Sequence, residues 1–123
     1  MAHNEEASFS LAENIKTIYS KKETILIISI LKDKEIESIL KNFSKISETV
    51  IFVSLDKNKR GLSETELYNI GYKYFKKSYA VKTVEKSLIL AKKIDKKVIV
   101  ATGSFYLIGE IKKIINKNNF QIY

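Results

Sequence analysis

The chain has 123 residues, the size of one domain, and we expect residues 1–123 to form a single domain. With no cysteine, one histidine, no apolar run of membrane length and no signal peptide, it is expected to have no disulfide and no metal site, and to be cytoplasmic and away from membranes. The formal net charge of +8 comes mainly from lysines spread over polar helix faces, so a solvated surface explains it better than nucleic-acid binding does.

The chain begins with a helical pattern. Leu11, Ile15 and Ile18 recur at helical spacing, which predicts a helix over residues 5–19 with these three side chains facing the core and Asn4 as its N-cap. In an alternating α/β chain a strand should precede such a helix. No apolar run lies there, so the order of elements predicts a domain whose opening strand is missing.

Apolar runs rich in β-branched residues predict the strands. The three strongest are Ile25–Leu31, Val50–Leu55 and Val98–Ala101, and each is continuous rather than alternating, as in strands buried on both faces. Tyr79–Val81 is predicted as a short strand, and Phe120–Tyr123 is a weaker candidate. The pattern indicates a mainly parallel sheet.

Helical patterns separate these strands. The first has Asp33 as its expected N-cap, the second starts with Ser63 and Glu66 in capping-box spacing, and the third has Thr83 as its cap. The apolar positions that define the three helices are Ile36, Ile39, Leu40 and Phe43; Leu67, Ile70 and Tyr74; and Val84, Leu88 and Ala91. Alternating strands and helices predict an α/β fold with right-handed connections and helices covering the sheet.

The segment Thr102-Gly103-Ser104 joins the last strong strand to a further helical pattern at Ile108, Ile111 and Ile115. Gly103 permits a tight turn and close approach of a ligand, while Ser104 can cap the helix and present a hydroxyl at its electropositive end. Taken alone, an ordinary N-cap is the simpler interpretation.

Polar residues follow the strands, and the carboxyl ends of parallel strands share one edge of the sheet. The residues concerned are His3 and Asn4, Lys32 and Asp33, Asp56, and Thr102 and Ser104. Each has a structural explanation as a cap, a turn or a solvated flank, but together they favour a site for a polar, anionic ligand. Asp56 as the phosphoacceptor of a receiver domain is discounted, because paired acidic residues after a first strand are lacking.

The usual catalytic signatures are absent from the sequence. There is no phosphate loop, no G-x-G-x-x-G fingerprint and no recognisable set of nucleophile, base and orienting acid. We therefore predict no catalytic residue in this chain alone.

Three segments resemble the C-terminal domain of folylpolyglutamate synthase, also called dihydrofolate synthase in bifunctional forms, within the Mur ligase superfamily. Ala2-His3-Asn4 resembles the end of the family's Asp-Gly-Ala-His-Asn-Pro motif, with Glu5 in the proline position. Leu31-Lys32-Asp33-Lys34 is similar to Leu-Lys-Asp-Lys at a strand end. Residues 102–110 are similar to Thr-Gly-Ser-Leu-Tyr-Leu-(Val/Ile)-Gly-Glu, the most specific of the three.

The resemblance implies a Rossmann-like three-layer domain of the Mur ligase C-terminal type. It implies part of a ligase that uses ATP and magnesium to add glutamate to folate, with this domain as a lid over glutamate and nucleotide and an upstream ATPase domain as its partner. His3 and Ser104 would bind glutamate, Asn4 would face the nucleotide, and Lys32 and Asp33 would lie at the interdomain edge, with no metal ligand and no tightly bound cofactor. The chain alone is expected to be inactive.

Two alternatives remain open. One is a related Mur-type ligase that adds an amino acid to a different acceptor, and the other is a stand-alone basic α/β module that binds polyanions. The chain also looks like a domain separated from its upstream part, or a gene fragment whose initiator falls inside the first motif. Without a strand before Ala2, an exposed sheet edge is expected to favour self-association.

Overall fold

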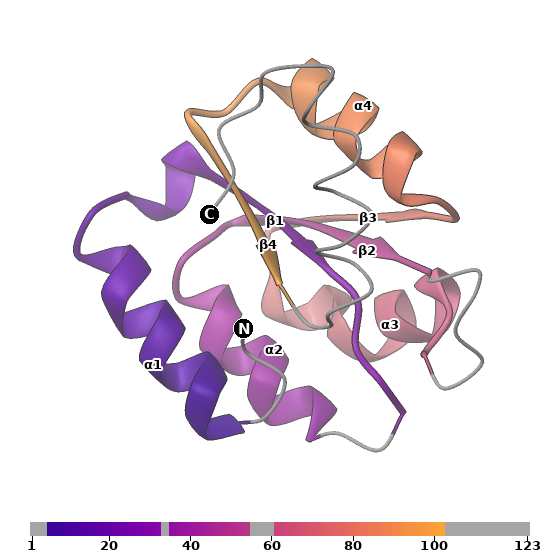
Figure 1. Ribbon diagram of the computed structural model, residues 1–123, viewed down its shortest axis with the longest axis horizontal. Helices are drawn as coiled ribbons and strands as arrows, with labels where there is room; N and C mark the ends of the chain where they lie inside the picture. Colours follow the sequence, from indigo (N-terminus) through magenta and orange to yellow (C-terminus); the bar gives the residue numbers. More distant parts are fainter. Residues whose placement is uncertain (1–4, 33–34, 55–60, 103–123) are drawn as a thin grey trace.

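Four parallel strands form one sheet in the order β3-β2-β1-β4 (Figure 1). The computed structural model describes residues 5–32, 35–54 and 61–102, with side chains from residue 9 onward. The strands are β1 (Thr24–Ile28), β2 (Thr49–Val53), β3 (Lys77–Val81) and β4 (Val98–Thr102). All of β1, β2 and β4 is buried, as the continuous apolar runs predict, whereas β3 is partly exposed along its whole length.

Helices cover both faces of the sheet, so the three-layer α/β prediction is confirmed (Figure 1). They are α1 (Glu5–Lys16), α2 (Ile36–Ser44), α3 (Glu64–Gly71) and α4 (Val84–Ile94), with short 3₁₀ turns η1 (Lys21–Glu23) and η2 (Tyr72–Tyr74). Helices α1, α2 and α3 pack on one face and α4 packs on the other. None of the helices in the described ranges is long and apolar enough to span a bilayer.

Alternation along the strands divides the core into two layers. In β1, Leu26 and Ile28 face α1, α2 and α3, while Ile25 and Ile27 face α4. Each face of the sheet therefore has its own apolar cluster, and the sheet is held between them.

The first strand ends earlier than predicted. It stops at Ile28 rather than at Leu31, because the parallel pairing with β2 and β4 reaches no further than Ile28. The apolar run continues because Ile30 is still fully buried in the α1–α3 cluster. The last strand ends later than predicted, since Thr102 is its final residue and not the start of the following turn.

Two predicted caps are confirmed and one is wrong. Ser63 and Glu66 form the complete capping box of α3, and the Thr83 hydroxyl accepts the backbone N–H of Lys86 at 3.1 Å. The expected cap at Asp33 is wrong because α2 begins only at Ile36, which puts Glu35 at the N-cap. The helical pattern predicted to extend to Tyr74 also changes form: α3 ends at Gly71, and the 3₁₀ turn η2 continues the chain to Tyr74.

The first helix starts as predicted but ends at Lys16 instead of residue 19. Ile15 is buried and Leu11 packs against the core, as expected. Ile18 was predicted to face inward, yet it is 65% exposed. Its N–H donates to the Ile15 carbonyl in a tight turn after the helix, so Ile18 no longer follows the helical face.

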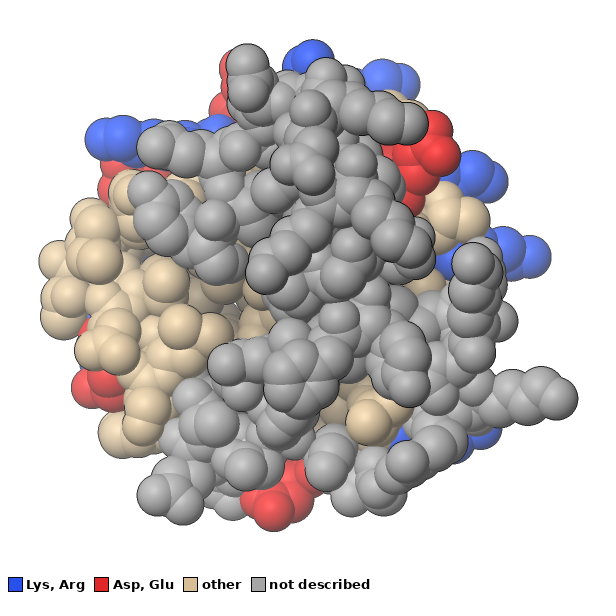
Figure 2. All heavy atoms as spheres, viewed as in Figure 1, with Lys and Arg blue, Asp and Glu red and all other residues tan. Residues whose placement is uncertain are grey.

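The sequence-predicted features at His3, Asn4, Asp33, Asp56 and Ser104 lie outside the described residues, as do the helical pattern after Ser104 and the Phe120–Tyr123 strand candidate. Pairing beyond β4 is likewise outside them, so self-association stays a prediction. All lysines of the described ranges are exposed, and Figure 2 shows basic and acidic side chains interspersed around the rim of the molecule. This distribution supports the interpretation of the charge as a solvated surface.

Candidate functional site

The sheet has a topological switch point between β1 and β4. From β1 the chain passes through α2 to β2 and through α3 to β3, always moving away from β4 along one face. It then returns through α4 on the opposite face to β4, on the other side of β1 (Figure 1). In open α/β sheets, ligands bind outside the carboxyl ends of the strands where the connections diverge in this way.

Buried polar groups lie at this switch point. Ile28 and Thr102 are the last paired residues of β1 and β4, and the backbone N–H of Ser29 donates to the Thr102 carbonyl at 3.4 Å. Ser29 is 0% exposed and Thr102 is 1% exposed. The β1–β4 edge therefore places two hydroxyl side chains inside the protein, immediately below the edge.

The Ser29 hydroxyl is an exception among the buried polar groups. No donor or acceptor of the described residues lies within hydrogen-bond distance of Ser29 Oγ, and the same holds for Ser78 Oγ on β3. A buried hydroxyl without a partner is costly, so nearly all such groups in proteins are paired. Ile28 and Ile30 flank Ser29 and pack in the α1–α3 cluster, so alternation puts the Ser29 side chain on the α4 face.

The equivalent serine after β2 has a full set of partners. Ser54 Oγ accepts the backbone N–H of Glu64 at 2.8 Å and donates to the Glu64 carboxylate at 3.0 Å. Because Glu64 is the first residue of α3, this pair of bonds satisfies one of the otherwise unpaired N–H groups at the start of that helix. At the β2 end of the edge, the protein itself therefore satisfies the hydrogen-bonding groups of the serine.

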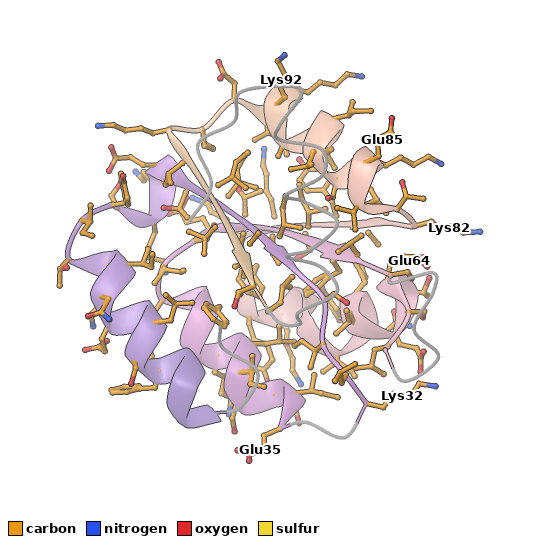
Figure 3. All side chains as sticks on the ribbon, in the orientation of Figure 1. Lys32, Glu35, Glu64, Lys82, Glu85 and Lys92 are labelled. Atoms are coloured by element: carbon orange, nitrogen blue, oxygen red, sulfur yellow. The ribbon has the colours of Figure 1, made fainter. Side chains whose placement is uncertain are left out.

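Of the five residues to which the resemblance assigns a site role, Lys32 alone lies within the described ranges, and it is exposed at the carboxyl edge. The chain after β1 runs toward the start of α3, where Leu31 forms an antiparallel bridge with Gly61 and the N–H of Leu62 donates to the Ile30 carbonyl at 3.0 Å. Figure 3 shows Lys32 at the far end of this path, on the side of the edge where α3 begins. Lys32 is thereby carried away from Thr102.

Glu66 is the acidic neighbour of Lys32. The pKa of Glu66 is lowered from its ordinary value, mainly by hydrogen bonds from the backbone and side chain of Ser63 and in smaller part by the charge of Lys32. The side of the edge near α3 therefore combines a positive charge with an ionised carboxylate. The negative charge of Glu66 weakens the attraction of Lys32 for an anion, so Lys32 alone is a poor anion-binding site and would need further donor groups beside it.

A hollow of about 510 Å³ lies elsewhere, between α2 and the end of α3. Its charged groups satisfy one another: Tyr74 donates to the Glu37 carboxylate at 2.6 Å, and Lys73 Nζ lies 3.3 Å from the same oxygen. These contacts lower the pKa of Glu37, with the Tyr74 bond as the main cause. The hollow thus offers no unpaired charge among these three groups, and the switch point remains the better candidate.

Sequence reasoning missed Ser29, although a signal was present. It is a polar residue inside the apolar run Ile25–Leu31, and a serine in a fully buried strand end needs a partner. Of the polar constellation predicted at the edge, the structure places Thr102 at the switch point and Lys32 nearer α3. No group of three or more His, Asp or Glu side chains that could hold a metal occurs within the described ranges.

The comparisons with known proteins agree with this architecture. A Bacillus subtilis dihydrofolate synthase/folylpolyglutamate synthase is 30% identical over 118 residues, covering 91% of this chain and 26% of the relative. The Mycobacterium tuberculosis folylpolyglutamate synthase complexed with ADP and AMPPCP superposes with a TM-score of 0.84 at 19% identity, over 95% of this chain and 29% of that one.

Two further structures show the same fold. E. coli FolC in complex with DHPP and ADP has a TM-score of 0.80 at 18% identity, over 97% of this chain and 28% of that one. The bifunctional folylpolyglutamate synthase/dihydrofolate synthase of Yersinia pestis, complexed with AMPPNP and Mn, has a TM-score of 0.80 at 19% identity, over 94% and 27%. The chain thus spans little more than a quarter of the length of each of these relatives.

The family described as "Dihydrofolate synthetase, C-terminal domain" matches residues 1–114, nearly the whole chain. The match includes the described sheet, both helical layers and the β1–β4 switch point. The chain belongs to this family of dihydrofolate synthetase C-terminal domains.

Proposed function

We propose that this chain acts as the C-terminal domain of a folylpolyglutamate synthase, an ATP-dependent ligase that adds glutamate to a folate. Bifunctional forms of this enzyme also have dihydrofolate synthase activity. Membership of the family and the name of the 30% identical Bacillus subtilis relative support this assignment. Because the chain spans about a quarter of that relative, the proposed activity belongs to an enzyme with additional, upstream domains.

The β1–β4 switch point is the observation that carries the proposal. It is the position at which sheets of this architecture bind polar ligands, and it contains the end of β4 from which the family-like segment 102–110 continues. The site chemistry suits a carboxylate or phosphate oxygen, because the Ser29 hydroxyl lies there without a partner among the described residues.

In the proposed reaction, a folate carboxylate is first activated as an acyl phosphate by ATP. The amine nitrogen of glutamate then attacks the acyl carbon, the new amide bond forms as the carbon–oxygen bond to phosphate breaks, and the amine loses a proton. This domain closes over the upstream ATPase domain and holds glutamate near the acyl phosphate, so its contribution is proximity and orientation.

Site roles follow from the resemblance. We propose that His3 and Ser104 bind the incoming glutamate, that Asn4 faces the nucleotide, and that Lys32 and Asp33 lie at the interface with the ATPase domain. Lys32 is exposed at the carboxyl edge, which suits a contact between domains. The chain itself supplies no catalytic residue in this scheme.

We place ATP and magnesium on the upstream part of the enzyme, where they would supply the transferred phosphoryl group. The resemblance implies no metal ligand in this chain. Relatives solved with ADP, AMPPCP, or AMPPNP and Mn support a nucleotide and a metal in the complete enzyme. Dependence on ATP also suits the cytoplasmic location expected from the sequence.

The test is a chimera. In the Bacillus subtilis relative, the matched 26% of the length is replaced by this chain, and phosphate release is measured with folate, ATP and varied glutamate. We expect glutamate-dependent turnover, with Ser104→Ala raising KM for glutamate and Ser78→Ala leaving it unchanged. Absence of turnover, or turnover that ignores glutamate, contradicts the proposal.

A further inference from the structure

The hydroxyl of Ser29 stands apart from the site residues suggested by the sequence motifs. It is fully buried, it follows the last paired residue of β1, and it has no hydrogen-bond partner among the described residues. The backbone of Ser29 is nevertheless held in place, because its N–H bonds to the Thr102 carbonyl of β4. The backbone of Ser29 is thus held at the β1–β4 edge, while its hydroxyl has no partner among the described residues.

Position separates Ser29 from the other unsatisfied hydroxyl. Ser78 is the second residue of β3, so it lies toward the amino ends of the strands and at an outer strand. Ser29 lies at the carboxyl end of β1, at the switch point with β4. A ligand bound where sheets of this class bind theirs can reach the neighbourhood of Ser29, but not that of Ser78.

The comparison with Ser54 excludes a general tolerance for unpaired serines at strand ends. Ser54 follows β2 just as Ser29 follows β1, yet its hydroxyl both accepts from and donates to Glu64. The same residue type in the same local position is satisfied where a helix N-terminus supplies the partners. At the β1–β4 edge, among the described residues, no such partner is supplied.

We propose that Ser29 Oγ is a ligand-binding group that donates a hydrogen bond to an anionic oxygen of the substrate or nucleotide at the switch point. This inference rests on the proposed function and extends its site by one residue. The shared chemistry is a carboxylate or phosphate oxygen, supplied by glutamate or by a nucleotide. A hydroxyl is suited to both, because it donates one strong, charge-assisted bond without carrying charge.

The experiment is a titration of the 123-residue chain with L-glutamate and, separately, with ADP, followed by backbone amide chemical shifts. Wild type, Ser29→Ala and Ser78→Ala are compared, together with their thermal midpoints. We expect Ser29→Ala to weaken one of the two ligands by about tenfold, the loss expected for one hydrogen bond to a charged group. Ser78→Ala should bind both ligands as wild type does, and neither variant should have a lower midpoint.

The outcomes separate the two proposals. If wild type binds and Ser29→Ala binds both ligands equally well, the role of Ser29 is overturned and the proposed function stands. A lower thermal midpoint for Ser29→Ala overturns it as well, because the hydroxyl then has a structural partner. If wild type binds neither ligand at millimolar concentration, the role of Ser29 is overturned, whereas the proposed function is judged by turnover of the chimera.

Discussion

The two halves of the carboxyl edge each have a serine directly after a strand, and the two serines differ in their hydrogen bonds. At the end of β2, Ser54 is bonded twice to Glu64, and α3 begins on top of it. At the end of β1, Ser29 is more deeply buried and its hydroxyl is unpaired among the described residues. At the β2 end the protein supplies the hydrogen-bond partners of the serine, and at the β1 end we propose that a ligand supplies them.

This difference has a topological origin. Helix α3 begins at Glu64, and the N–H of Glu64 bonds to the Ser54 hydroxyl at the end of β2. β1 and β4 adjoin where the strand order reverses, with α2 after β1 on one face of the sheet and α4 before β4 on the other, and Ser29 Oγ has no partner there among the described residues. Stability and ligand binding are therefore expected to separate along one sheet edge, and the following substitutions test that separation.

Phe52→Ala should have the largest effect, because it removes the centre of the β2–α3 half. Phe52 is fully buried and makes edge-on ring contacts with Tyr68 and Phe75. Replacing a buried phenylalanine with alanine costs about 3–5 kcal/mol of unfolding free energy. Urea denaturation measures the loss, with Ile89→Ala, a 52% exposed site, as the control; equal losses would contradict the assignment of the core.

Gly71→Ala should destabilise the same half by about 1–3 kcal/mol, as overpacking does in well-filled cores. A Cβ at this position would lie 2.7 Å from Leu40 Cδ1 and 2.7 Å from Phe52 Cζ. The absence of a side chain is what lets α3 sit close to α2 and β2. A thermal midpoint equal to that of wild type would show that the α3 contact is looser than described.

Ser54→Ala should cost about 1–2 kcal/mol of unfolding free energy, because it leaves the Glu64 N–H at the start of α3 without its partner. Ser29→Ala should cost nothing or slightly stabilise the chain, since no protein hydrogen bond of the described residues is lost. The pair of variants is measured by the same denaturation curves. Equal destabilisation by both would remove the distinction between the two halves.

Ser63→Ala should have a smaller effect than Ser54→Ala, about 1 kcal/mol, through loss of the Ser63 hydroxyl that caps α3. The effect depends on pH. The folded-state pKa of Glu66 lies below its ordinary value of 4.5, so its contribution to stability is present above pH 4.5 and is lost as pH falls through the folded pKa. Ser63→Ala keeps the backbone N–H bond to the Glu66 carboxylate and removes only the contribution of the hydroxyl, so wild type should lose part of its advantage over the variant in acid. A difference that grows in acid would contradict this sign.

Much of the fold could be predicted from residue patterns. Continuous β-branched runs identified the three buried strands, and Ser63, Glu66 and Thr83 identified two helix starts, because capping is a local interaction. The errors arose at positions where tertiary packing, and not the local sequence, determines where an element ends. The apolar run of β1 continues to Leu31 because Ile30 packs in the core and not because the strand continues.

The candidate site could be predicted less well. The carboxyl edge and Thr102 were foreseen from the strand order, but Lys32 was expected beside them and lies nearer α3, because the path after β1 is set by the Leu31–Gly61 bridge. Ser29 was overlooked although it interrupts an apolar run, because only the structure shows that its hydroxyl has no partner among the described residues. Ser54 looked identical in sequence and proved to be structural.

The most direct test of the account is a map of backbone amide shifts on addition of L-glutamate or ADP to the intact chain. The account predicts that at least one of the two ligands shifts the amides of Ser29 and Thr102 at the β1–β4 edge while those of Ser54 and Glu64 stay in place. Shifts centred on Ser54 and Glu64, with Ser29 and Thr102 unchanged, would contradict the central claim that the ligand site lies at the switch point.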